Sequence, residues 1–349
     1  MRITLIVTLV LLQSLSLIAS ADTIIYNSNG FEAPTFTAGS SPLGQDPSNP
    51  WIVFGGTPNA FSVENSMVAS GTQAIQATGG GLNDGSFAFP ELDYTPGANE
   101  RVSIQVDIAR SLTSIIDNSS PVYAIDIYDQ DVDRTSRFGL QQNGGQIRTF
   151  VSAPINDSGQ VDPTGTGIAS QYFGPAIAQN TFVHFNVTLD FADRTVDMSV
   201  NGTLLAAGIP FLAQSATTLS AAALEIGTFN NLSADNGYFD NYTVTSVPYL
   251  RGDVNTDGIV NGLDLNMVAT NWLKTGVAPT GDVNEDGIVN GLDINIIASK
   301  WLTTLNPGGG GSAAGAAVPE PGTFALLITG MVLATATYGR RRISTRRGH

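Results

Sequence analysis

Short runs in which apolar and polar residues alternate fill the chain from residue 22 to about residue 247. The clearest run is 183–200, in which every second residue is apolar on both sides of a turn at 192–194. The turn pair Asn201-Gly202 follows at once. Because a period of two places alternate side chains on one face of a strand, this pattern predicts a β-meander with one buried face.

Similar alternation at 102–108 and 122–127, and the segments 225–227 and 238–244, predict further strands. No stretch before residue 247 has a convincing helical period. Many short strands without an internal repeat favour two stacked sheets, because stacking or closure protects strand edges. We therefore expect a mainly β fold, with residues 22–247 forming a β-sandwich of the jelly-roll, concanavalin-like kind. The run 186–205 resembles the laminin-G and concanavalin-like sandwiches, in which a strand, a short turn and an Asn-Gly turn recur.

The pattern changes completely at residue 253. The twelve residues 253–264 recur at 282–293 with a register of 29 residues, and each copy continues into an apolar segment that ends in Trp-Leu. We expect a small all-α module at 251–305 with one helix after each repeat. These helices are expected to bury one apolar set against another, namely Leu263, Met267 and Val268 against Leu292, Ile296 and Ile297.

Each repeat has the spacing of a calcium loop: oxygen ligands at positions 1, 3 and 5, glycine at 6, a backbone carbonyl at 7 and a carboxylate at 12. Position 9 offers an additional oxygen, directly or through water. Two Asx-rich turns are the alternative, but the same spacing would then have to arise twice. The expected ligands are Asp253, Asn255, Asp257, Ile259, Asn261 and Asp264 in the first loop and Asp282, Asn284, Asp286, Ile288, Asn290 and Asp293 in the second.

These loops resemble type I dockerin repeats, in which aspartate also stands at position 12. The resemblance implies that two Ca²⁺ ions stabilise a core too small to fold alone. It also implies a cohesin-like protein partner. Positions 10 and 11, often Ser-Thr-like contact residues in dockerins, are Gly262-Leu263 and Gly291-Leu292 here. The partner therefore stays open between a cohesin-like domain, another protein and an intramolecular contact.

The charge of the chain narrows the choice of ligand. The net charge is -15, and between residues 22 and 318 nine lysine and arginine residues face 29 acidic ones. Such a surface repels nucleic acid and attracts divalent cations, so we expect no nucleic-acid partner. There is no cysteine and there are only two histidines, which excludes disulfides and the usual zinc sites.

Both ends of the chain carry targeting patterns. Residues 1–21 have a basic start, an apolar run and Ala19-Ser20-Ala21, and predict a signal peptide, with an uncleaved anchor as the alternative. A Gly/Ala linker at 306–317 leads to a tail at 318–349 that begins Val-Pro-Glu-Pro, continues as an apolar segment, expected to be a single helix, and ends in arginines.

The tail resembles the bacterial PEP-CTERM sorting signal. That resemblance implies a membrane-inserted tail, processing by an exosortase-type enzyme and an association with exopolysaccharide; a plain membrane anchor is the alternative. We expect a bacterial protein that is exported to the cell envelope, the cell surface or the extracellular matrix.

Candidate chemistry in the predicted sandwich is sparse. Glu32 and Asp240 lie near its two ends and are candidates for a third calcium site, with two unrelated surface carboxylates as the alternative. Trp51 beside Pro50 is expected to pack in the core rather than stack on a sugar. No closely spaced carboxylate pair and no Ser/His/Asp set is visible, so no catalytic residue is predicted.

Three functions follow from these patterns. The first is a non-catalytic envelope protein whose sandwich recognises a glycan or another envelope component and whose dockerin-like module assembles with a protein through calcium. The second is an extracellular hydrolase acting on O-glycosyl bonds of polysaccharides. The third is a purely structural matrix protein.

Overall fold

The computed structural model describes residues 22–55, 60–78, 86–111, 122–143, 145–155, 168–227 and 235–305. The predicted signal peptide, the Gly/Ala linker and the sorting tail with its apolar helix lie outside these ranges. Among the described residues, no helix has the length and apolar character needed to cross a membrane. The described part belongs to one compact unit, which ends at Leu305.

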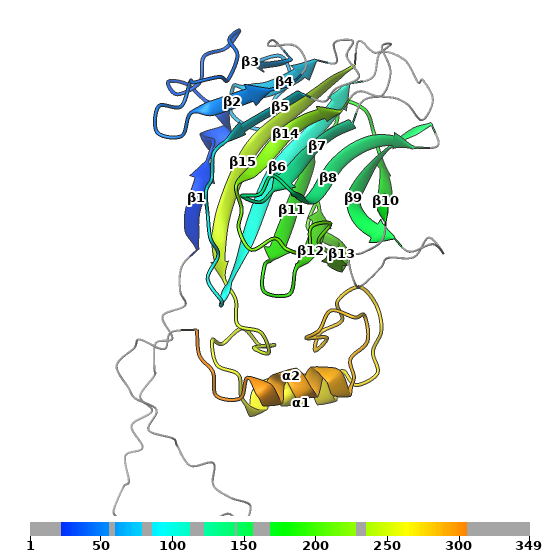
Figure 1. Cartoon of the computed structure of the whole chain (residues 1–349). Helices are drawn as coiled ribbons and strands as arrows, with labels where there is room; N and C mark the ends of the chain where they lie inside the picture. The colour runs from blue at the N-terminus through cyan, green and yellow to red at the C-terminus, as the bar shows by residue number, and fades with distance from the viewer. Residues whose placement is uncertain are drawn as a thin grey trace, which may run out of the picture. The chain divides into compact units, whose positions relative to one another are not determined.

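Two antiparallel sheets make up residues 22–248 (Figure 1). Within the described ranges the first sheet has eight strands: β1 Thr23–Asn27, β3 Phe61–Glu64, β4 Ala74–Thr78, β6 Glu100–Ser111, β11 Val183–Asp190, β12 Thr195–Val200, β13 Thr203–Pro210 and β15 Asn236–Pro248. Their order is β13-β12-β11-β6-β15-β4-β3, and β1 also pairs with β15. A short 3-10 helix, η1 (Asn29–Phe31), follows β1.

The second sheet has seven strands within the described ranges: β2 Trp51–Phe54, β5 Ser86–Pro90, β7 Val122–Tyr128, β8 Arg134–Asn143, β9 Gln146–Ile155, β10 Ile168–Ile177 and β14 Ala221–Gly227. Their order is β10-β9-β8-β7-β14-β5-β2. Both sheets contribute buried side chains to one hydrophobic core, so the mainly β, two-sheet prediction is confirmed.

The alternation at 183–200 forms the hairpin β11–β12. Its core-facing residues are buried at every second position, and Phe185 pairs with Val200 across the hairpin. Asn201 and Gly202 follow with φ of +49° and +76°, the left-handed backbone that a tight turn requires. Strand β13 then pairs with β12 and completes the predicted meander.

Trp51 is the centre of an aromatic cluster in the core, as the sequence predicted. Its side chain is 1% exposed, and its indole Nε1–H donates a 2.7 Å hydrogen bond to the Tyr26 hydroxyl. Phe31, Phe36 and Tyr242 surround the indole at centroid distances of 5.4 to 6.3 Å, in edge-to-face geometry. Such pairs add to the free energy gained by burial.

The module at 251–305, called the loop module below, contains helices α1 (Gly262–Thr270) and α2 (Gly291–Ser299). Its core is one small cluster of six buried residues, to which Val268 and Ile297 contribute from the helices. The expectation that Leu263 and Leu292 are buried is wrong, since they are 59% and 58% exposed. Both leucines lie in the first turn of their helix. Leu265 and Ile294, two residues further along, pack against the core.

We predict that Trp51→Ala lowers the free energy of unfolding by about 3 to 5 kcal/mol, because it removes a large buried side chain and the partner of Tyr26. Urea unfolding followed by circular dichroism measures the change. Phe54→Ala, in the same strand but 69% exposed, is the matched control and is expected to change stability by less than about 1 kcal/mol. Equal losses in the two variants would contradict the central role of Trp51.

Candidate calcium loops and a charged sheet face

The first loop folds around the aspartate at its first position. Asp253 accepts hydrogen bonds from the backbone N–H of Asp257 (3.0 Å) and of Gly258 (2.7 Å). Gly258 has φ of +83°, a conformation that disfavours side chains other than glycine. The Asp257 carboxylate accepts from the Ile259 N–H at 2.9 Å. The loop therefore closes on itself with its carboxylate oxygens turned inward.

The second loop repeats these contacts residue by residue. Asp282 accepts from the N–H groups of Asp286 (3.2 Å) and Gly287 (2.8 Å), and Gly287 has φ of +85°. Asp286 accepts from Ile288 N–H at 2.9 Å. The duplicated sequence thus gives a duplicated backbone geometry.

The aspartate at position 12 joins each loop to its helix. Asp264 is fully buried and accepts from the N–H groups of Val254 (2.8 Å), Asn255 (3.1 Å) and Asn261 (2.7 Å). Asp293 is also fully buried and makes the equivalent three contacts. Each completes a capping box at the helix N-terminus, where a negative charge is favourable.

Asn261 and Asn290 at position 9 act as helix caps. The Asn261 side-chain oxygen accepts from Leu263 N–H at 2.8 Å, and its amide donates to the Ile259 carbonyl at 3.1 Å. Asn290 makes the same two contacts in the second loop. Both side chains thus lie over the position 7 carbonyls, and their role as calcium ligands stays a prediction.

The donor set suits a hard divalent cation. Burial, with repulsion from Asp264 and Asp257, raises the pKa of Asp253, and Asp282 is affected in the same way by Asp293 and Asp286. A cation among these oxygens would remove that repulsion. Across the described residues, no three acidic, histidine or cysteine side chains form a metal site by themselves. Asparagine and backbone oxygens would therefore complete each ligand set.

Glu285, at position 4 of the second loop, contacts the sandwich. Its carboxylate lies 2.7 Å from Arg101 Nη2, and the same guanidinium bonds Asp190 at 2.9 Å and packs 3.5 Å from the Tyr249 ring centroid. A Cβ atom at Gly208 would lie only 2.7 Å from the Glu285 carbonyl oxygen, so glycine permits this approach. Position 4 of the first loop is Thr256, which is exposed and whose uncharged side chain cannot form an ion pair.

The structure brings Glu32 and Asp240 to one short segment, residues 69–73. Asp240 is fully buried and accepts from the N–H groups of Ala69 (2.9 Å) and Ser70 (3.1 Å). Glu32 accepts from the N–H groups of Thr72 and Gln73. Burial raises the pKa of Asp240 to about 6. The two carboxylates therefore hold this segment in place, and a third calcium site there stays a prediction.

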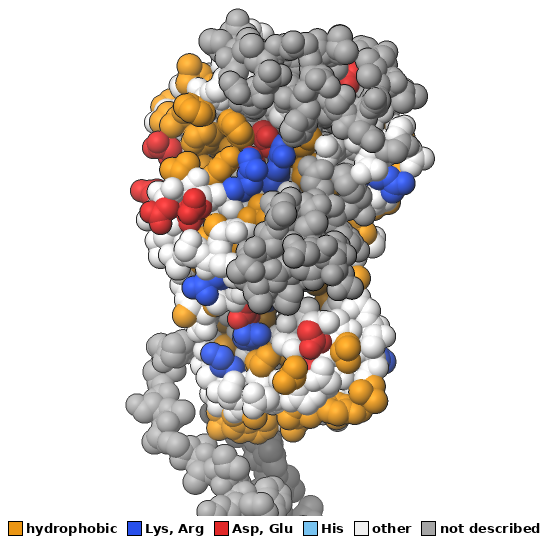
Figure 2. Space-filling model, turned by 45° about the vertical axis from the view of Figure 1, so that its right-hand side comes forward, with side chains coloured by type: hydrophobic (Ala, Val, Ile, Leu, Met, Phe, Trp, Pro, Cys, Tyr) orange, Lys and Arg blue, Asp and Glu red, His pale blue; other side chains and the backbone are white. Residues whose placement is uncertain are grey.

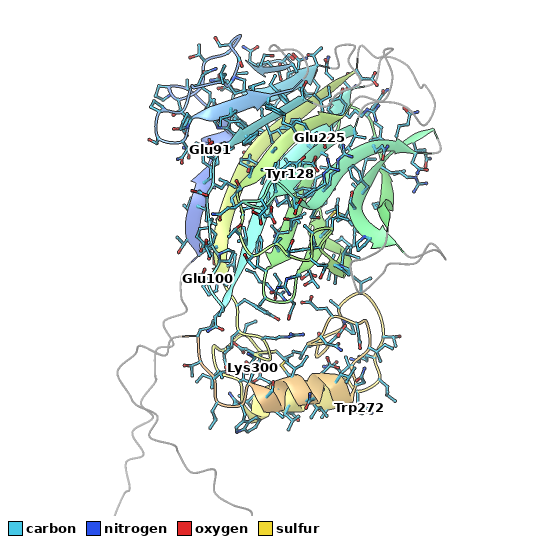
Figure 3. All side chains as sticks on the ribbon, viewed as in Figure 1. Glu91, Glu100, Tyr128, Glu225, Trp272 and Lys300 are labelled. Carbon is cyan, nitrogen blue, oxygen red and sulfur yellow. The ribbon has the colours of Figure 1, made fainter. Side chains whose placement is uncertain are left out.

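A cluster of charges on the outer face of the seven-stranded sheet was not predicted. Arg137 donates to Glu225 through Nε (2.7 Å) and Nη2 (2.6 Å), and its Nε lies 3.7 Å from Asp126. Arg134 Nη2 lies 2.8 Å from the other Asp126 oxygen. Asp126 is 0% and Glu225 4% exposed. Figure 3 labels Glu225 and Tyr128 on this face.

The environments of the two clustered carboxylates differ. Burial, with repulsion from Asp126, raises the pKa of Glu225 to about 8 despite the opposing effect of Arg137. Asp126 forms its closest ion pair with Arg134, whose side chain is 40% exposed. The sequence held one signal for this cluster, since an acid interrupts the apolar pattern in each of β7 and β14. That signal does not show that the acids meet.

Comparisons with known proteins identify only the loop module. Residues 251–300 match the family described as the dockerin type I domain, and type I dockerin domains generally bind calcium. A search of curated proteins found no match. The module is called the dockerin module below.

Solved structures resemble the sheet arrangement at low identity. One titled "Sialidase" is 13% identical over 65% of this chain and 19% of that chain, with a TM-score of 0.40. Alginate lyase AlyC3 in complex with dimannuronate is 9% identical over 56% of this chain and 80% of that one, at 0.41. An endo-1,3-beta-glucanase from Streptomyces sioyaensis is 11% identical over 60% and 94%, at 0.41. These likenesses carry no conclusion about a ligand.

We predict that raising the pH lowers the free energy of unfolding of the wild type relative to that of Glu225→Gln. The pKa is higher in the folded than in the unfolded chain, so the folded state binds more protons between about pH 4.5 and pH 8. The contribution of Glu225 to the free energy of unfolding is therefore full below about pH 4.5 and decreases as the pH rises to about 8. Melting temperatures of both proteins between pH 5 and pH 9 measure the effect, and parallel curves would contradict it.

Proposed function

We propose that this chain is an exported envelope protein that assembles through a calcium-dependent dockerin module, while its sandwich recognises a glycan. The observation that carries the proposal is the duplicated loop. In both copies a buried aspartate fixes the loop to the first turn of its helix, and the remaining carboxylates turn inward. This geometry is costly in an acidic chain unless a cation neutralises it.

Two calcium ions are the proposed cofactors of the dockerin module. One is assigned to Asp253, Asn255, Asp257, Ile259, Asn261 and Asp264, and the other to Asp282, Asn284, Asp286, Ile288, Asn290 and Asp293. The small core supports this assignment, because six buried residues supply little free energy of folding without a metal.

The proposed protein-binding surface is the set of apolar side chains that the dockerin module leaves exposed. Leu263 and Leu292 occupy equivalent places in the two repeats, and further exposed residues are Trp272 (46%), Leu273 (66%), Trp301 (39%) and Leu302 (51%). Figure 2 shows hydrophobic side chains gathered along the helical edge. A contiguous apolar surface of this kind fits a cohesin-like domain or another protein with an apolar contact face.

The proposed location is the bacterial cell envelope, cell surface or extracellular matrix, and rests on the sequence of the two termini. Export would be directed by residues 1–21, and residues 318–349 would insert in the membrane and be processed by an exosortase-type enzyme. We assign the sandwich to residues 22–247, the dockerin module to 251–305 and the linker to 306–317.

A glycoside hydrolase is the second candidate function, and the Asp126–Glu225 pair favours it. Glycoside hydrolysis requires one carboxyl group that stays protonated near neutral pH and one that is ionised. Glu225 has the raised pKa of such an acid. Its two-atom contact with Arg137, however, engages both of its oxygens, which suits binding better than proton donation. We therefore place recognition before catalysis, and a purely structural matrix role third.

A panel of polysaccharides distinguishes the three functions. The purified full chain is incubated with each polymer, with calcium and with chelator, and both retained protein and released reducing ends are measured. Retention without release is the expected result. Release that disappears in Glu225→Gln and Asp126→Asn would establish hydrolysis, and neither retention nor release would favour the structural role.

Calcium binding is expected to order the dockerin module. We predict that chelation removes the circular dichroism signal of α1 and α2, and that titration calorimetry counts two tight sites in the wild type and one in either Asp264→Ala or Asp293→Ala. Each substitution removes a ligand and leaves three loop N–H groups without an acceptor. Glu91→Ala, exposed on the sandwich, is the control. Two tight sites in both variants would refute the ligand assignment.

Partner binding is expected to depend on the repeated leucines. We predict that Leu263→Asp combined with Leu292→Asp weakens binding to a type I cohesin domain, or to whichever protein partner is identified, by at least about tenfold, since a buried unpaired charge is costly. Calcium stoichiometry stays at two. Surface plasmon resonance gives the affinity, and Leu43→Asp, at a 59% exposed leucine of the sandwich, is the control. Unchanged binding in the double variant would show that the partner binds a different surface of the protein.

A further inference from the structure

The outer face of the seven-stranded sheet carries one continuous transverse row of side chains. Phe54 pairs with Phe87, Phe87 with Glu225, Glu225 with Ala124, and Ala124 with Gly139. Because residues paired across adjacent strands share a face, the two aromatic rings, the Glu225 carboxylate and the small residues Ala124 and Gly139 follow one another across the sheet. The row thus places an apolar platform next to a polar site.

The platform has exposed aromatic surface. Phe54 is 69% exposed, and Phe87 and Tyr128 are half-buried. Phe87 and Tyr128 meet edge to face with centroids 6.3 Å apart. Rings held in this way present an apolar surface that the C–H face of a pyranose can cover, at little cost in side-chain entropy.

Polar groups of the cluster lie close to the surface beside this platform. The Arg134 side chain is 40% exposed, and its Nη2 lies 2.8 Å from the buried Asp126 carboxylate. The hydroxyl group of the half-buried Tyr128 donates to the same carboxylate at 3.0 Å. Asp126 therefore positions two groups that a hydroxylated ligand can contact, while it stays buried itself.

The charge on this face differs from the charge of the chain. Three of the six arginines between residues 22 and 248, Arg134, Arg137 and Arg148, lie on it, against the two carboxylates of Asp126 and Glu225. Arg148 bonds the Gly174 carbonyl and the Gln146 side chain, and within the described ranges it forms no ion pair. Figure 2 shows Lys/Arg side chains grouped beside hydrophobic ones. An excess of cations here, on a chain of net charge -15, favours an anionic ligand.

We propose that this face binds an acidic polysaccharide, with Phe87 and Tyr128 against the pyranose rings and Arg134 and Arg148 paired with uronate carboxylates. The inference rests on the proposed glycan recognition by the sandwich and names its site and its ligand class. Arginine suits this role because its planar fork pairs with a carboxylate through two hydrogen bonds.

The test uses the calcium-loaded full chain and oligosaccharides in matched pairs. Oligomers of glucuronic, galacturonic and mannuronic acid are each compared with the neutral hexose oligomer of the same linkage, by titration calorimetry at low and high salt. At least one acidic oligomer is expected to bind at least about tenfold more tightly than its neutral counterpart. The difference is expected to shrink at high salt.

Variants separate this face from the rest of the molecule. Arg134→Gln and Phe87→Ala are each expected to weaken binding about tenfold or more, at unchanged calcium stoichiometry and with the circular dichroism spectrum of the folded protein retained. Arg134 is chosen because its side chain is 40% exposed and its replacement leaves the Arg137–Glu225 pair in place. The matched control is Arg194→Gln, in the turn between β11 and β12 of the other sheet, and is expected to change nothing.

Three results would overturn the proposal. If a neutral oligomer binds as tightly as its acidic partner, the ligand class is wrong while glycan recognition stands. If an acidic oligomer binds but Arg134→Gln and Phe87→Ala bind it equally well, the site is wrong. If no polysaccharide of either class is retained, both this inference and the proposed glycan recognition fail.

Discussion

The hydrogen bonding of β15 is the constraint on which the rest of the described structure depends. This 13-residue strand pairs with β6 along most of its length and with β4 and β1 on its other edge. It also supplies Tyr242 to the aromatic cluster around Trp51. The first repeated loop begins at Asp253, five residues after the strand ends at Pro248, and between them Tyr249 N–H donates to the Asn99 carbonyl at 2.9 Å. The same pairing therefore fixes the sandwich and the start of the dockerin module.

An excess of acidic residues is the second constraint, and the molecule meets it in two ways. In the sandwich, some arginines pair with more than one acid, as Arg101 does with Asp190, Asp197 and Glu285 and Arg137 does with Asp126 and Glu225. A buried carboxylate without a partner is costly, so buried acids of the sandwich are held by arginines, as Asp126 and Glu225 are, or by backbone N–H groups, as Asp240 is. The dockerin module has no arginine after Arg251, and its acids converge in loops instead. A metal ion would supply there the charge that arginine supplies in the sandwich.

The sequence predicted those features that depend on neighbouring residues. Alternation predicted β11 and β12 because one face of each strand is buried, and the loops were recognisable because their contacts lie within twelve residues. The Asp126–Glu225 cluster could not be predicted, since the pairing of β7 with β14 joins distant segments. Leu263 and Leu292 were misplaced for a related reason. Each nine-residue helix has apolar residues on more than one side, and only the packed structure shows that Val268 and Ile297 face the core.

The two repeated loops match at every residue proposed as a calcium ligand but differ in their surroundings. Position 4 is Thr256 in the first loop and Glu285 in the second, and Glu285 is held by Arg101 beside the closely approaching Gly208. Ordering the second loop would therefore also order an ion pair made by a residue of the loop itself, whereas the ion pair beside the first loop, between Arg251 and Asp193, precedes that loop. If the second loop binds calcium as proposed, its affinity would therefore be thermodynamically linked to the ion pair between Glu285 and Arg101 of the sandwich. The repeats 253–264 and 282–293 differ only at position 4, and that one side chain makes their contacts with the sandwich asymmetric.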